Sequence, residues 1–194
     1  QKSAIYALSF LFFMWGFLSC LNDLLVPYLR GVFSLTYTQA MMVQFSFYSA
    51  FFLFAIPLGF VVDKLGYKKG IILGLTIASL GCLLFYPAAQ LVAYSVFLFA
   101  LFVLAIGICC LQVAANPYVV LLGPEHTASR RLNLTQGFNS LGTTVAPYFA
   151  AIFIFSTMAE VTSGVDAVKL PYVFIAGTLV ALALVFSRLK LPQV

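Results

Sequence analysis

Charged residues are scarce in this chain of 194 residues, where Asp, Glu, Lys and Arg together make up 8% of the sequence and acidic residues number 5. Hydrophobic residues make up 63%, and the mean hydropathy is +1.10. This balance excludes a water-soluble domain, because a core of this size cannot hide so much apolar surface. The few charges also gather in short clusters separated by long apolar stretches. The composition therefore predicts a helical protein that crosses a membrane several times.

Histidine and cysteine are also few, and their positions argue against catalysis and metal binding. The single histidine, His126, lies in a short polar loop beside Glu125, with no nucleophile or metal-binding partner nearby in the sequence. All four cysteines fall inside apolar stretches, where a metal site or a disulfide framework is not expected. We therefore expect no enzyme activity, no metal and no cofactor.

Six apolar stretches approach or exceed the length of about 20 residues that a helix needs to cross a bilayer. They contain Gly and Pro, which membrane helices tolerate better than soluble ones do. We therefore expect residues 1–194 to form one all-α bundle of six transmembrane helices. The predicted spans are 4–29, 38–62, 70–86, 94–122, 132–157 and 171–187.

Basic residues divide unevenly between the two sides of such a bundle. Two of them, Arg30 and Lys169, fall on one side, and eight fall on the other: Lys2, Lys64, Lys68, Lys69, Arg130, Arg131, Arg188 and Lys190. The positive-inside rule then predicts that both termini are cytoplasmic. The net charge of +5 follows from this topology, and the loops contain no nucleic-acid-binding motif.

Polar side chains within the apolar stretches are concentrated in the first, second, fourth and fifth of them. A carboxylate such as Asp23 costs about 3 kcal/mol or more inside a membrane and is usually retained for a proton, an ion or a substrate. Residues three or four apart lie on one helix face, so Gln112 is expected above Asn116 and Gln136 near Asn139. We expect these four spans to face a polar interior and the third and sixth to face lipid. The alternative is that such groups only hold helices together.

The loop between the second and third spans has the sequence Gly59-Phe60-Val61-Val62-Asp63-Lys64-Leu65-Gly66-Tyr67-Lys68-Lys69. Asp63 is suited to cap the following turn, and Gly66 permits a tight reversal. An ordinary basic hairpin would also have these features. The pattern, however, resembles the motif between helices two and three of the major facilitator superfamily. This resemblance implies that Gly59, Asp63, Lys64, Gly66 and Lys68 belong to a conformational latch on the cytoplasmic side.

Three further stretches narrow the resemblance: Asn22-Asp23 with Pro27, the run from Leu111 to Tyr118, and the run from Arg131 to Gly142. Together they resemble the fucose permease and glucose/galactose permease family of proton-coupled sugar symporters. The resemblance covers almost the whole chain. It implies the N-terminal six-helix half of a twelve-helix carrier, built from two inverted three-helix repeats, in a bacterial inner membrane.

The same resemblance assigns roles to individual residues. Asp23 matches the carboxylate that takes up and releases the proton, and Gln136 and Asn139 match amides near the sugar. Gln112 stands where fucose permease has a glutamate, which favours glucose or galactose over fucose as the hexose. Asn22, Gln44 and Asn116 are adjacent or similarly placed in their spans, and we include them in the predicted substrate site.

Several alternatives to this prediction stay open. Sodium is the alternative coupling ion, because a lone carboxylate with nearby carbonyls can serve either ion. A non-transporting membrane scaffold or sugar sensor is the alternative function. The predicted partners are a hexose, membrane lipid, and either a missing C-terminal six-helix half or a second copy of the chain. The absence of an initiator Met and the end just past the sixth span favour a missing half.

Overall fold

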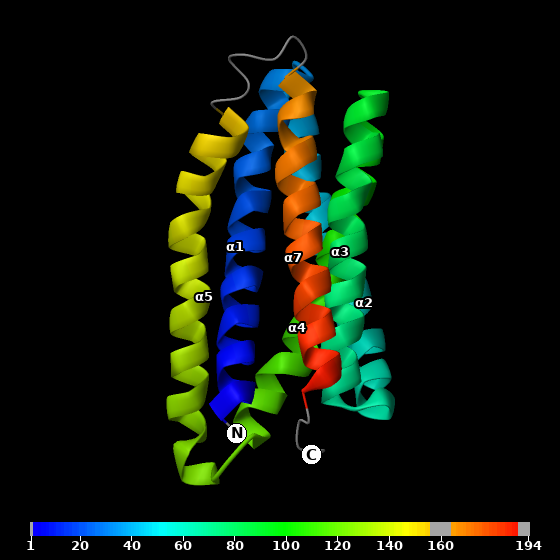
Figure 1. Ribbon diagram of the computed structural model, residues 1–194. Helices are drawn as coiled ribbons and strands as arrows, with labels where there is room; N and C mark the ends of the chain where they lie inside the picture. The colour runs from blue at the N-terminus through cyan, green and yellow to red at the C-terminus, as the bar shows by residue number, and fades with distance from the viewer. Residues whose placement is uncertain (1, 156–163, 190–194) are drawn as a thin grey trace.

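The computed structural model describes residues 2–155 and 164–189, and almost all of them are helical. Six of the helical stretches are long and apolar enough to cross a membrane, which confirms the predicted fold class. Figure 1 shows the long helices running side by side as one bundle. Their bounds are α1 Lys2–Val32, α2 Tyr37–Leu65, α3 Tyr67–Leu91, α4 Tyr94–Leu121, α5 Ala128–Ala150 and α7 Lys169–Arg188.

Most helices extend a few residues beyond the predicted apolar spans. Helix α3, for example, begins at Tyr67 and so includes Lys68 and Lys69 in its first turn. Hydropathy marks only the part of a helix that lies in hydrocarbon, whereas the backbone hydrogen bonds continue into the polar interface. Short segments complete the chain: the 3-10 turns Glu125–Thr127 and Gly164–Val168, and a π-helical turn, Ala151–Phe155, after α5. The predicted end of the fifth span, at 157, lies outside the described residues.

The two connections next to α2 show how the sequence sets helix ends. Before α2, the Thr36 hydroxyl accepts a hydrogen bond from the Gln39 amide N–H, and the Gln39 side chain accepts one from the Thr36 N–H. This reciprocal capping box fixes the start of the helix. After α2, Gly66 has φ +83°, a conformation that favours glycine, so the predicted tight reversal is confirmed. The predicted Asp63 cap is wrong, because Gly66 itself occupies the N-cap of α3 and no side chain bonds there.

Close packing joins both consecutive helices and helices that are distant in sequence. Helix α1 packs along α5, α2 packs along α4, and α3 packs against both α4 and α7. Helices α1 and α5 meet through glycines: a Cβ added at Gly16 would collide with the Asn139 carbonyl oxygen, and one added at Gly142 would collide with the Phe13 carbonyl oxygen. If the first three long helices are matched in order to the last three, α1 corresponds to α4 and α2 corresponds to α5. The contact of α1 with α5 then corresponds to the contact of α4 with α2. This relation is the one that two inverted repeats require.

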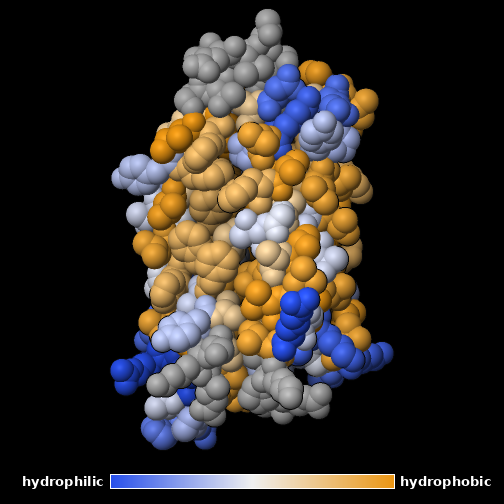
Figure 2. Space-filling model, viewed as in Figure 1, coloured by the Kyte–Doolittle hydropathy of each residue, from blue (hydrophilic) through white to orange (hydrophobic). Residues whose placement is uncertain are grey.

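The surface has the charge distribution of a membrane protein. Figure 2 shows a broad apolar band with hydrophilic residues towards both ends. We call the end that carries Lys64, Lys68, Lys69, Arg130 and Arg131 the basic end, and the end that carries Arg30 and Lys169 the opposite end. Large apolar side chains of α3 and α7, such as Leu80, Phe174 and Leu184, are exposed on the bundle surface. Exposure of this kind is expected where lipid covers the protein.

Candidate functional site

A hydrogen-bonded network joins α1 to α2 and contains the only acidic residue of α1. Asn22 Nδ2 donates to Gln44 Oε1 at 3.0 Å, and Gln44 Nε2 donates to Asp23 Oδ1 at 2.7 Å. The side-chain amide of Gln44 therefore accepts a hydrogen bond from Asn22 through its oxygen and donates one to Asp23 through its nitrogen. Three residues that the sequence placed in the candidate site are thus in direct contact.

Asn22 and Asp23 are neighbours in sequence but lie in different surroundings. Consecutive side chains of a helix point about 100° apart, and here Asn22 is 1% exposed whereas Asp23 lies on the surface of the six-helix bundle. Asn22 Oδ1 is buried without a hydrogen-bond partner among the described residues. Pro27, one turn after Asp23, cannot donate to the Asp23 carbonyl, so this turn of α1 offers further acceptor capacity. Acceptors gathered in this way suit a proton, a small cation or a hydroxyl-bearing substrate.

The other predicted site residues lie on α4 and α5. Asn139 Nδ2 donates to the Phe12 carbonyl oxygen at 3.1 Å, so this amide helps to hold α5 against α1. Gln112 and Gln136 are half-buried and make no hydrogen bond with the described residues. Asn116 Oδ1 is buried and, within the same part of the chain, has no partner. Three of these four amides therefore keep unused hydrogen-bonding groups.

Two of the candidate residues, Asp23 and Asn139, lie at different levels of the bundle. Asn139 lies beside Phe12 and Gly16 of α1, and Asp23 follows Gly16 by seven residues along the same helix. At 1.5 Å per residue, Asp23 is about 10 Å nearer to the opposite end than Gly16 is. The resemblance to the sugar symporter family and the face periodicity grouped these side chains into one site, but periodicity does not give the register between helices. The structure separates Asp23 from the level of Asn139, which we call the amide level.

Among the predicted latch residues with charged side chains, Lys68 makes hydrogen bonds, whereas Asp63 and Lys64 make none with the described residues. Lys68 Nζ donates to the carbonyl oxygens of Ser187 and Leu189, at 2.9 and 2.8 Å, and so caps the C-terminal end of α7. Asp63 and Lys64 are exposed and make no ion pair or hydrogen bond with the described residues. Lysine near a helix C-terminus is favourable because the last carbonyls lack intrahelical partners.

The sequence did not identify a second cap at the basic end. The Arg131 guanidinium donates to the Val119 and Val120 carbonyl oxygens at the end of α4, at 3.0 and 2.7 Å, and to Thr127 Oγ1. In the sequence, Arg131 is the second residue of the pair Arg130-Arg131, and this pair indicated only which side of the membrane the loop lies on. Lys68 and Arg131 together tie the ends of α7 and α4 to the helices that carry these two cations. No group of three or more metal-binding side chains gathers within the described ranges.

The bundle, with polar groups at two membrane depths, has the architecture of a membrane carrier, and comparison with known proteins places it in a family. The family model for the Major Facilitator Superfamily matches residues 6–193. This chain belongs to the major facilitator superfamily. Its sequence is 53% identical over 193 residues to a glucose/galactose transporter of Brucella abortus, covering 98% of this chain and 47% of that protein.

Two further similarities confirm the predicted branch of the family. The chain is 39% identical over 199 residues to the L-fucose-proton symporter of Escherichia coli K12, covering 94% of this chain and 45% of that protein. It superposes with a TM-score of 0.84 and 38% identity on a crystal structure of the major facilitator transporter FucP in the outward conformation, covering 98% of this chain and 50% of that one. The match is to the N-terminal half. The chain thus spans about half the length of the relatives that it matches, and these relatives are transporters rather than enzymes.

Proposed function

We propose that this chain forms one half of a carrier that transports a hexose together with a proton by alternating access. The observation that carries the proposal is the Asn22–Gln44–Asp23 network, which holds one carboxylate at membrane depth within hydrogen-bonding reach of an amide. Intramembrane carboxylates of this kind commonly take part in proton transfer. The names of the relatives, a glucose/galactose transporter and an L-fucose-proton symporter, support a sugar substrate and a coupled proton.

The geometry suggests how Asp23 would respond to a proton. As a carboxylate, it accepts the hydrogen bond from Gln44 Nε2 at 2.7 Å. Protonation adds an O–H donor to the same group while the remaining oxygen still accepts. A protonated Asp23 therefore offers a donor to a sugar hydroxyl and carries no charge through the occluded state. Sodium is the alternative ion, because carboxylate and amide oxygens are also ligands for hard cations.

The amide level would provide the sugar contacts. Gln112, Gln136 and Asn139, with Asn116 nearby, present donors and acceptors that can replace the water around sugar hydroxyls. Gln112 cannot titrate, so Asp23 is the residue of α1, α2, α4 and α5 that would carry the proton at membrane depth. The higher identity to the glucose/galactose transporter than to the fucose symporter favours glucose or galactose as the hexose.

A second six-helix unit would complete the carrier. The chain covers about half of its relatives, and α2 and α5 are the least buried helices of the bundle. We propose that the missing unit lies across from α1, α2 and α5 and that the sugar binds between the two halves. A second copy of this chain is the alternative partner. The gathering of basic residues at one end supports a location in the bacterial inner membrane, with both termini cytoplasmic.

We propose that the loop at the basic end controls which side of the carrier is open. Lys68 already holds α7, whereas Asp63 and Lys64 are free to meet the second half. Neutralising Asp63 would then alter the balance between the two open states while sugar binding persists.

The Asp23→Asn variant of the complete carrier tests the proposal in proteoliposomes. The variant keeps an acceptor for Gln44 but cannot release a proton, so proton-driven accumulation of glucose or galactose should be lost while sugar exchange continues. Glu125→Gln, which changes an exposed loop carboxylate, should accumulate sugar normally. Full proton-driven accumulation by Asp23→Asn would refute the role of Asp23.

A further inference from the structure

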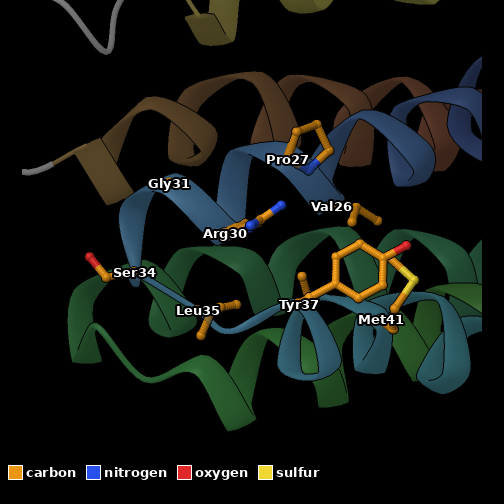
Figure 3. A pocket seen from close by; sticks show the side chains of 9 residues that line it. Val26, Pro27, Arg30, Gly31, Ser34, Leu35, Tyr37 and Met41 are labelled. Carbon is orange, nitrogen blue, oxygen red and sulfur yellow. The ribbon is translucent and has the colours of Figure 1, made fainter.

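A pocket of about 540 Å³ lies between α1 and the start of α2, near the opposite end of the bundle. Pro27, Arg30 and Ser34 line it from α1 and the connection that follows, and Tyr37 and Met41 line it from α2. Figure 3 shows Arg30 on α1, directed towards Pro27, with the Tyr37 ring on the α2 side of the pocket. We call this cavity the Arg30 pocket. Its size falls in the range of small-molecule sites, about 300–1,000 Å³.

The chemistry of the Arg30 pocket combines an aromatic face with free donors. The guanidinium carbon of Arg30 lies 5.9 Å from the centroid of the Tyr37 ring, and Tyr37 is 68% exposed. Arg30 is itself exposed, and none of the described residues gives it an ion pair or a hydrogen bond. Its five N–H groups are therefore available to a ligand. Ser34 and Tyr37 also line the pocket.

A second cation–π pair at this end provides a contrast. Lys169 Nζ lies 5.7 Å from the centroid of the Tyr86 ring, but it also forms an ion pair with Asp166 at 2.5 Å. This pair joins α7 to α3, away from the Arg30 pocket. The charge of Lys169 is thus satisfied within the protein, whereas the charge of Arg30 is not.

The Arg30 pocket lies along the same helix faces as the Asp23 network. Asp23, Pro27 and Arg30 are spaced by four and three residues on α1, so they form one stripe, and all three are exposed. Tyr37, Met41 and Gln44 repeat this spacing on α2. The hydrogen bond between Gln44 and Asp23 lies where the two stripes meet. Arg30 therefore lies about two helical turns, or about 10 Å, from Asp23 along α1, whereas Pro27, which also lines the pocket, lies about one turn from Asp23.

We propose that the Arg30 pocket is a separate hexose-binding subsite, in which a sugar arriving from the opposite end binds before it moves on to the amide level. A hexose has an apolar C–H face that can stack on Tyr37 and hydroxyls that can accept hydrogen bonds from Arg30. A small anion is a poorer fit, because Arg30 is the single cationic residue that lines the pocket and most of the lining is apolar. The inference rests on the proposed hexose transport.

The test compares variants of the complete carrier in phosphatidylcholine proteoliposomes, with the sugar supplied on one face at a time. Arg30→Gln and Tyr37→Ala should each raise KM about tenfold for glucose or galactose supplied at the opposite end, the equivalent of one charged hydrogen bond. The kcat for sugar supplied at the opposite end should stay unchanged. For sugar supplied at the basic end, KM should stay unchanged and kcat should fall by the same factor, because one equilibrium constant links kcat/KM in the two directions. Tyr37→Phe, which keeps the ring, should behave nearly like the unaltered carrier. Lys169→Gln and Tyr86→Ala are the matched controls and should change neither constant.

Several results would overturn the inference. Unchanged KM values in Arg30→Gln and Tyr37→Ala would show that the pocket binds no sugar, and equal increases from both faces would assign these residues to the central site. A matching increase in the Lys169 control would indicate a general effect of surface charge. An effect of Arg30→Gln that appears only after phosphatidylglycerol is added would identify a lipid headgroup as the ligand. If the unaltered carrier moves no hexose, the proposed function fails, and this result is distinct from all of the others.

Discussion

Helix α1 makes two contacts of opposite character along its length. Its first half meets α5 through Gly16 and Gly142, where the backbones approach so closely that a Cβ does not fit. Its second half meets α2 through Asn22, Asp23 and Gln44, where hydrogen bonds between side chains join the two helices. One helix therefore has a packed region and a polar region.

We propose that these two regions separate stability from function. Lipid tails are as apolar as leucine, so helices associate through close packing of small residues, as in the glycine contact of α1 with α5. Polar groups at the contact of α1 with α2 add little to association and retain capacity for a proton or a substrate. Substitutions in the first region should affect folding, whereas those in the second should affect transport.

The largest effect is expected from Gly142→Ala in the packed region. The new Cβ would collide with the Phe13 carbonyl oxygen and force α1 and α5 apart, at a cost of about 1–3 kcal/mol. Gly137→Ala, on the same helix but facing open space, should instead stabilise the helix by about 0.5–1 kcal/mol. Thermal unfolding of the purified variants in detergent measures both changes. Equal unfolding temperatures for the two would contradict the close contact of α1 with α5.

A smaller effect is expected from Gln44→Leu in the polar region. This change removes the donor to Asp23 and leaves Asn22 Nδ2 buried without its acceptor. Proton-driven sugar accumulation should fall about tenfold, the equivalent of about 1.5 kcal/mol for a hydrogen bond to a charged group. Ser49→Ala is the control, since its hydroxyl donates to the Ser46 carbonyl within α2. Equal accumulation by the two variants would exclude a role for the network in coupling.

The sequence predicted the helices of both regions, but it did not predict how these helices pack against one another. Hydropathy located six helices, and the cost of a membrane carboxylate drew attention to Asp23 before any contact was known. Asn22, Gln44 and Asp23 were assigned to one site, and the structure joins them. The contact of Asn139 with the Phe12 carbonyl was not predictable, because periodicity shows which residues share a helix face but not how far one helix is shifted along another.

Three further features could not be predicted correctly from the sequence. Gly16 and Gly142 are single glycines in long apolar stretches and become informative only when α1 lies against α5. Asp63 was expected to cap the next turn because acidic residues favour such positions, but Asp63 lies within α2 and Gly66 occupies the N-cap of α3. Lys68, assigned to a latch by resemblance, was not expected to bind the end of α7.

The smallest effect is expected at the basic end, where a polar contact lies outside the apolar band. Lys68→Met removes the cap on α7 and should lower stability by about 1 kcal/mol or less, because the side chain is partly exposed to solvent. For a chain of this length, the change corresponds to about 2–4 °C in the unfolding temperature. Lys69→Met, at an exposed neighbouring position, should leave the temperature unchanged. A lower temperature in both variants would mean that net charge, rather than the cap, stabilises this end.

The central claim is that hexose transport is coupled to a proton through Asp23. The most direct measurement is the pH outside proteoliposomes of the complete carrier when glucose or galactose is added without a sodium gradient. The outside should become more alkaline as sugar enters, and this change should disappear in Asp23→Asn. Sugar uptake without any proton movement, or uptake that requires a sodium gradient, would contradict the claim.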